Sequence, residues 1–149
     1  MRRDMYGETE VMRRRSGELR EQGVDLRALA DRLVAQTEGA RWTGRAAAAL
    51  GERIRERASR LRDLAGRHDT AADSLDAHVV EVERLKDAIA GIERKADSLV
   101  ADAHTRIART DAATHDVRIA PAPEDALLAA FTRPPAGHRD WLSVELPGL

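Results

Sequence analysis

The chain of 149 residues contains no cysteine and few aromatic residues, which make up 3% of it. The absence of cysteine excludes a disulfide framework, a thiolate metal site and a cysteine nucleophile. With so few rings, any core must be built from aliphatic side chains. The β-branched and aromatic residues that strands favour are scarce, so neither a β-sandwich nor a β-barrel is expected.

Long apolar runs and an excess of either charge are missing too. No apolar run approaches the roughly 18 residues that a membrane-spanning helix needs, so we expect no membrane span. No apolar stretch follows Arg2 and Arg3 at the basic N-terminus, so we expect no general secretory signal peptide. The net charge is -1, from 25 Lys and Arg against 26 Asp and Glu. We therefore expect no nucleic-acid partner.

Sequence patterns of catalysis and metal binding are also missing. There is no Gly-x-Ser-x-Gly motif and no phosphate-binding glycine loop. The five histidines include no pair at the i, i+3 or i, i+4 spacing that places two imidazoles on one metal ion. Carboxylates are numerous, but they are scattered over solvated helices, where they stay ionised. We predict that the protein is not an enzyme, with no catalytic residues, metal site or cofactor.

Charged residues are abundant, at 34% of the chain, and they occur with many alanines and leucines. This composition is typical of long solvated helices with narrow apolar seams. All five prolines follow residue 120, so the helical body is expected to end near Ile119. The predicted fold is all-α: an antiparallel helical hairpin with a long second helix and a proline-containing tail. We place the hairpin domain at 1–120 and the tail at 121–149.

The first helix of the hairpin is predicted from about Glu8 to Gly39. Apolar residues recur along it at spacings of seven, and small residues beside them would let a neighbouring helix come close. These small residues are Ser16, Gly23, Ala30 and Thr37. The break at 39–44 is short, which makes the two helices antiparallel neighbours. The predicted hairpin core consists of Met12, Leu19, Leu26, Leu33, Leu50, Ile54 and Leu61.

A second seam of near-heptad spacing begins after this break and continues to Thr110. As one rod, 45–120 would span roughly 100 Å at ~1.5 Å per residue, and the first helix covers less than half of that. Gly66 is the better candidate for a bend and Gly91 the second, but the heptad phase runs through Gly66 and favours one long helix. The uncovered part of the seam predicts a partner interface. Its residues are Leu75, Val79, Val82, Ile89, Leu99 and Ile107.

The tail is predicted to hold a short helix over 124–131, opened by Pro123, and an extended segment after Pro134 and Pro135. Two of the four aromatic residues of the chain lie in this tail, and such residues are costly to leave in water. We predict that the tail docks on the helices or on a partner, through Phe131, Trp141 and Leu142.

Trp42-Thr43-Gly44, between two amphipathic helices and followed by an alanine-rich turn at 45–50, resembles the W-x-G turn of the WXG100 (ESX) family of type VII secretion. Residues 26–33 and 72–78 are similar to segments of the type VII signal domains of actinobacterial toxins. The resemblance covers roughly residues 10–110. It implies that Trp42 and Gly44 belong to a secretion or assembly signal. The alternative from the residues alone is a hydrophobic plug at a turn, and both interpretations of Trp42 can hold together.

The resemblance implies a partner or substrate of a type VII secretion system. Such a chain would pair with a WXG100-like chain, with the targeting domain of a toxin or with itself as a homodimer. A secretion ATPase would recognise the turn together with a partner's tail. Family substrates commonly carry Tyr-x-x-x-Asp/Glu after the second helix, where this chain has His78 and Val82. Either a partner supplies that signal for export, or the chain stays in the cytoplasm as a chaperone-like partner. The alternative is a cytoplasmic, self-associating coiled-coil adaptor.

Overall fold

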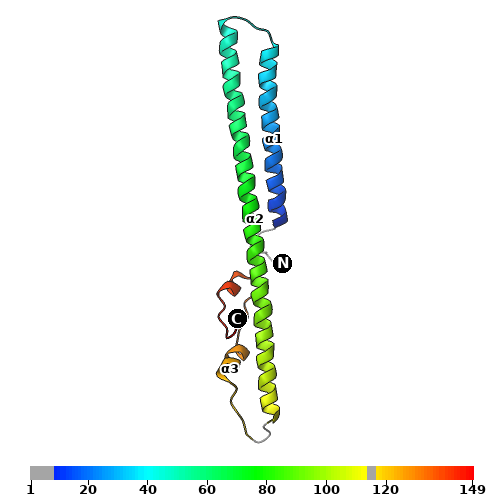
Figure 1. Ribbon diagram of the computed structural model, residues 1–149, viewed down its shortest axis with the longest axis vertical. Coiled ribbons are helices and arrows are strands. Elements are labelled where there is room, and N and C mark those ends of the chain that lie inside the picture. Colours follow the sequence, from blue (N-terminus) through cyan, green and yellow to red (C-terminus); the bar gives the residue numbers. More distant parts are fainter. Residues whose placement is uncertain (1–8, 114–116) are drawn as a thin grey trace. The chain divides into compact units, whose positions relative to one another are not determined.

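The computed structural model describes residues 9–113 and 117–149, and their secondary structure is entirely helical, without a β-strand. The elements are α1 (Thr9–Gly39), α2 (Arg45–Ala113), α3 (Pro123–Ala129) and the 3-10 helix η1 (Arg139–Ser143), as Figure 1 shows. The predicted all-α fold is confirmed. The chain forms two compact units, one ending at Val82 and the other continuing from Glu83 through the tail.

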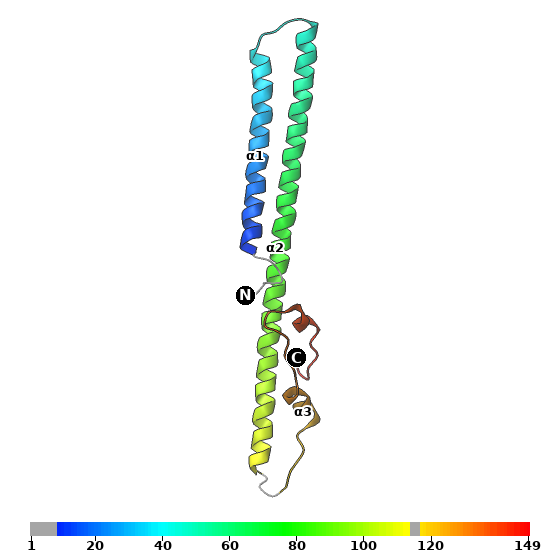
Figure 2. The same cartoon turned by 180° about the vertical axis from the view of Figure 1, so that it is seen from behind.

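The first unit is the hairpin, in which α1 and the first part of α2 lie side by side and antiparallel (Figures 1 and 2). The Ser16 hydroxyl lies 3.4 Å from the Ala72 carbonyl oxygen, to which it donates a hydrogen bond. A Cβ atom added at Gly23 would lie 3.4 Å from the carbonyl oxygen of Ala65. The buried residues between the helices are small and seven apart: Ser16, Gly23 and Ala30 on α1, and Gly51, Ala58, Ala65 and Ala72 on α2. We call these residues the small-residue seam.

The leucines predicted as the hairpin core lie beside this seam and not in it. Six of the seven predicted core residues are half-buried: Met12, Leu19, Leu26, Leu33, Ile54 and Leu61. The prediction was wrong for Leu50, which is 38% exposed, because its neighbour Gly51 takes the buried position. The centre of the hairpin is therefore built from alanine, glycine and serine, with leucines along its edge.

α2 is a single helix that passes through both candidate break sites, Gly66 and Gly91. Just after Gly66, the Thr70 hydroxyl donates to the Gly66 carbonyl oxygen one turn back, at 3.0 Å, inside the continuous helix. The described part of the helix reaches Ala113, and the residues from 117 onward are not helical, so the helix does not extend to the expected Ile119. Residues 117–120 are exposed and not helical, which agrees with the restriction that Pro121 places on the residue before it.

The buried positions of α2 shift by three residues between Val79 and Val82. Up to Val79 they continue the small-residue seam, whereas from Val82 onward every seventh residue is buried in the new phase: Ile89, Ala96 and Ala103. Residues three apart lie on the same face of a helix, about 60° apart around its axis, so Val82 and Ile89 fall in line with Leu61 and Leu75. The most buried row of α2 therefore changes from the small-residue seam to the neighbouring row between the first compact unit and the second.

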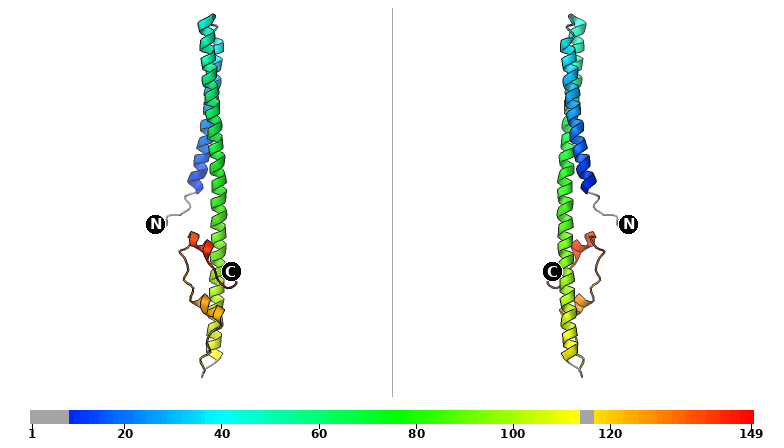
Figure 3. Two further views of the ribbon diagram at one scale, coloured as in Figure 1. Left: turned by 90° about the vertical axis from the view of Figure 1, so that its left-hand side faces the viewer. Right: turned by 90° about the vertical axis from the view of Figure 1, so that its right-hand side faces the viewer.

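The second unit consists of 83–113 of α2 and the tail that lies along it (Figure 3). α3 begins at the expected Pro123, and it buries Leu128. The extended segment expected after Pro135 is wrong at 139–143, which form η1. The His138 side chain accepts a hydrogen bond from the Asp140 backbone N–H at 3.2 Å, and this cap favours a helical turn at that point.

Candidate partner-binding surface

Trp42 projects from the turn between α1 and α2, and 67% of its surface is exposed. The turn uses left-handed backbone at Arg41 (φ 48°) and at Gly44 (φ 102°), a conformation that favours glycine. α2 starts directly afterwards, with the Ala48 N–H donating to the Gly44 carbonyl oxygen at 3.1 Å. An indole this exposed does not plug the end of the hairpin. It is available for contact with another molecule.

A pocket of about 590 Å³ lies at this end of the hairpin. Its lining includes the indole of Trp42, the cations Arg41 and Arg55, and the carboxylates Glu38 and Glu52. Arg55 and Glu52 lie 3.8 Å apart. The pocket therefore presents one aromatic face among charges of both signs, without a surplus that would select a simple ion.

One face of the hairpin is closed by ion pairs between the two helices. Arg20 contacts Asp73 at 2.8 Å and Asp76 at 2.7 Å. Arg62 contacts Asp31 at 2.7 Å. Arg27 pairs with Asp69. All seven residues stand one or four positions after a residue of the small-residue seam, and we call this side the ion-pair face.

Ion pairing on this face shifts two pKa values. The Ser16 hydroxyl and the Arg20 guanidinium lower the pKa of the Asp76 carboxyl, and hydrogen bonds to Asp76 and Asp73 raise the pKa of Arg20. These side chains remain partly in contact with water, which screens the ion pairs and keeps their contribution to stability small. Their main effect is to fix the register of α1 against α2.

The opposite side of the hairpin is apolar and open. A helix turns by about 100° per residue. Residues three or six positions after a member of the small-residue seam therefore lie opposite the ion-pair face, whose residues stand one or four positions after such a member. Because the helices are antiparallel, these positions of both helices share one side. Most of these positions are apolar, and we call the following set the apolar face: Leu19, Leu26, Leu29 and Leu33 on α1, and Leu50, Ile54, Leu61, Leu64, His68 and Leu75 on α2. The other positions hold Gln22, Gln36, Arg57, Ala71 and His78.

Three leucines of the apolar face are strongly exposed: Leu29 at 40%, Leu50 at 38% and Leu64 at 41%. Near its middle is a pocket of about 280 Å³, lined by Gln22, Asp25, Leu26, Leu64 and His68. The Nδ1 atom of His68 is buried there and has no hydrogen-bond partner among the described residues. A contiguous row of half-exposed leucines of this length is typical of a protein interface.

The residues predicted as a partner interface are largely covered by the chain itself. Val79 and Val82 are each 3% exposed and Ile89 is 1% exposed, so the prediction of an open surface was wrong for these three. Leu75, Leu99 and Ile107 are half-buried. For the positions beyond Glu83 the reason is that the tail occupies this surface of α2.

The tail is anchored by Trp141, which is fully buried. Its Nε1–H donates to the Pro135 carbonyl oxygen at 3.0 Å. The ring of Phe131 lies 6.1 Å away between centroids, and the Arg133 guanidinium lies 5.5 Å from the indole centroid. Trp141 is therefore buried and Phe131 packs beside it, but Leu142 is 46% exposed and the prediction was wrong for it.

Polar contacts join the tail to α2 on both sides of this anchor. The Gly137 backbone N–H donates to Glu93 at 2.6 Å, and Arg133 lies 3.3 Å from Asp97. Arg106 donates from both Nε and Nη2 to the Asp125 carboxylate, with a shortest distance of 2.6 Å. This bidentate pair lowers the pKa of the Asp125 carboxyl and raises that of Arg106.

Acid is expected to loosen the tail. Because the pKa of Asp125 is lowered from its ordinary 3.8, its stabilising contribution is present above that value and is lost as pH falls through the lower, folded-state pKa. Trp141 fluorescence, recorded in a Trp42→Phe variant, should therefore be constant from about pH 7 to 5 and should change only below about pH 4, where the tail loosens around its Trp141 anchor. Asp125→Asn should lose much of this acid dependence. Release between about pH 5 and 7 would contradict the assignment.

The residues at 9–113 and 117–149 contain no group of three or more His, Asp or Glu that could hold a metal ion. None of their helices is both long and apolar enough to cross a membrane. The fold and its surfaces define a helical hairpin of coiled-coil type, with an exposed tryptophan at its turn and one open apolar face. No protein-family model, curated protein or solved structure matches the chain.

Proposed function

We propose that this chain is a type VII secretion partner or substrate of the WXG100 kind, which pairs through its apolar face with another helical hairpin. The partner would be a WXG100-like chain or the targeting domain of a toxin. The observation that carries the proposal is Trp42, an indole 67% exposed at the tip of an antiparallel hairpin. An indole is costly to leave in water, and the hairpin covers only a minor part of this one.

The apolar face supports the pairing step. Its leucines are half-exposed in the chain alone, and burial against a second hairpin would give a four-helix bundle with the ion-pair face outward. In this proposal the Trp42 turn stays accessible in the pair, where a secretion ATPase would recognise it together with a partner's tail. The chain would be cytoplasmic before any export.

The pairing step is tested by affinity purification of the tagged chain from its native host, with bound chains identified by mass spectrometry. We expect recovery, in near-equal amounts, of a second hairpin with a W-x-G turn. Leu29→Glu with Leu64→Glu should abolish this recovery, because two charges would be buried in the interface. Val24→Glu with Val80→Glu is the matched control, since these valines are exposed but lie off the apolar face. Recovery of the chain itself alone would favour the self-associating adaptor.

Replacing Trp42 with alanine should separate recognition from folding. Because the side chain is exposed, we expect helix content to be unchanged and the free energy of unfolding to change by less than about 0.5 kcal/mol. Partner assembly or export should fall. Circular dichroism with urea unfolding, and the purification above, measure the two effects. Loss of helix content would mean that the indole has a structural function, and unchanged assembly and export would exclude Trp42 from recognition.

A further inference from the structure

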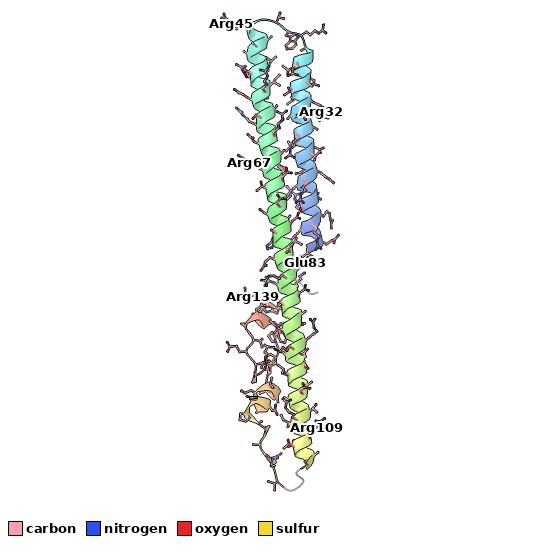
Figure 4. The ribbon with its side chains drawn as sticks, in the orientation of Figure 1. Arg32, Arg45, Arg67, Glu83, Arg109 and Arg139 are labelled. Carbon is pink, nitrogen blue, oxygen red and sulfur yellow. The ribbon has the colours of Figure 1, made fainter. Side chains whose placement is uncertain are left out.

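The apolar face is bordered along α2 by a row of arginines. They stand two or six positions after a residue of the small-residue seam: Arg53, Arg57, Arg60 and Arg67, which we call the arginine border. All four are exposed, and Figure 4 shows Arg67 on the side of α2 away from α1. Among the described residues their closest carboxylate contact is Arg60 to Glu56, at 3.9 Å. Glu56 and Asp63 stand five positions after the seam, further around the helix.

The opposite border of the apolar face, along α1, is electrically balanced. Its equivalent positions hold Arg15, Glu18, Asp25 and Arg32. Arg15 and Glu18 already pair with each other at 2.9 Å. The two borders of the apolar face therefore differ by four charges, with all of the surplus on the α2 side.

A second copy of the chain does not complement this arrangement. In a symmetric pair across the apolar face, the arginine border would meet either its own copy, which is repulsive, or the balanced border of α1, which leaves the surplus unmatched. Charged residues that flank an apolar helical interface select the partner and its orientation. We infer that the partner is a different chain, whose helix along α2 carries a row of acidic residues beside its apolar stripe. This inference rests on the pairing function proposed above.

A protein partner fits the two borders better than an anionic membrane surface does. A membrane would contact both borders at once, and Glu18 and Asp25 along α1 would be repelled by anionic headgroups. A helix lying along α2 contacts only the arginine border. The asymmetry of charge across the apolar face thus favours an acidic helix.

The test uses two designed helical peptides of about four heptads with one common leucine stripe. One peptide carries Glu beside the stripe and the other carries Lys at the same positions. Their binding to the full chain is measured by fluorescence anisotropy at low salt. We expect the acidic peptide to bind about tenfold more tightly or better, and the difference to shrink at high salt. Changing all four residues of the arginine border to Gln should remove the preference. The matched control changes Arg45, Arg94, Arg109 and Arg139 to Gln and should keep it.

The outcomes separate this inference from the pairing function itself. Equal binding of both peptides would leave pairing through the apolar face in place and overturn the acidic partner. A preference that survives loss of the arginine border would also overturn it. If neither peptide binds, the proposed pairing function fails. Stable dimers of the chain in sedimentation that are lost in Leu29→Glu with Leu64→Glu would overturn the acidic partner in favour of a second copy. Binding to phosphatidylglycerol vesicles that depends on the arginine border, without binding to either peptide, would overturn the acidic partner in favour of a membrane.

Discussion

Trp141→Ala is expected to release the tail from α2 while the hairpin stays folded. Trp141 is fully buried, and its indole joins three contacts in the tail: the Pro135 carbonyl oxygen, the Phe131 ring and the Arg133 guanidinium. Removing a buried tryptophan costs about 3–5 kcal/mol. Besides Trp141, the tail buries Leu128 of α3 and makes polar contacts with α2 such as Arg106 with Asp125. Trp141 is the largest fully buried side chain among the described residues, so we expect its loss to outweigh these contacts.

Hydrogen exchange measures this release segment by segment. Amides in 123–149 that bond within the tail, such as those of Ala130 and Val144, should lose their protection in Trp141→Ala. Amides of the hairpin should keep theirs, because α1 and the first part of α2 form a separate compact unit. Trp42→Ala is the matched control, because it removes the same side chain from an exposed position and should leave exchange in the tail unchanged.

Two results would contradict this account. Retained protection in the tail would mean that ion pairs such as Arg106–Asp125 dock it without the indole. Loss of protection throughout the chain would mean that the tail is needed for folding of the hairpin. We expect protection to be lost in the tail and kept in the hairpin. Release of the tail would then leave Ile89 and its neighbours on α2 open for a partner.

The sequence predicted the helical architecture well, because its signals are local. Proline positions, the 39–44 break and the heptad spacing fix two long helices and a tail, and α1, α2 and α3 lie close to where they were expected. The same spacing favoured one long helix over a bend at Gly66, and α2 is one helix. Glycine only weakens a helix, by about 1 kcal/mol relative to alanine, and packing along α2 decides the outcome.

The interface prediction was wrong in part because hydrophobicity alone does not say which apolar stripe the chain covers. Val79, Val82 and Ile89 are more hydrophobic than the small-residue seam, and they were expected to face a partner. Covering Ile89 depends on where 121–149 docks, which is a contact between residues distant in sequence. The sequence does contain a signal for the open apolar face. The small residues mark the line along which the two helices touch, and Leu29 and Leu64 stand six positions after two of these residues.

Ala30→Leu is expected to destabilise the hairpin by at least about 1–3 kcal/mol, the usual effect of overpacking a tight core. Ala30 is 0% exposed on α1, and Ala58 is 0% exposed on α2. The approach of a Gly23 Cβ to within 3.4 Å of the Ala65 carbonyl oxygen shows how little space the seam leaves. A leucine side chain fits only if the helices separate, and separation would break pairs such as Arg62–Asp31 on the ion-pair face.

Urea unfolding followed by circular dichroism compares this variant with Ala28→Leu, which makes the same change two residues away at an exposed position of α1. Alanine and leucine have similar helix propensities, so the control should change the unfolding free energy by less than about 0.5 kcal/mol. Equal midpoints for the two variants would show that the seam tolerates larger residues. Separated helices would also move the leucine rows of the apolar face apart. Ala30→Leu should therefore weaken partner binding even at temperatures where the chain remains helical, and Ala28→Leu should not.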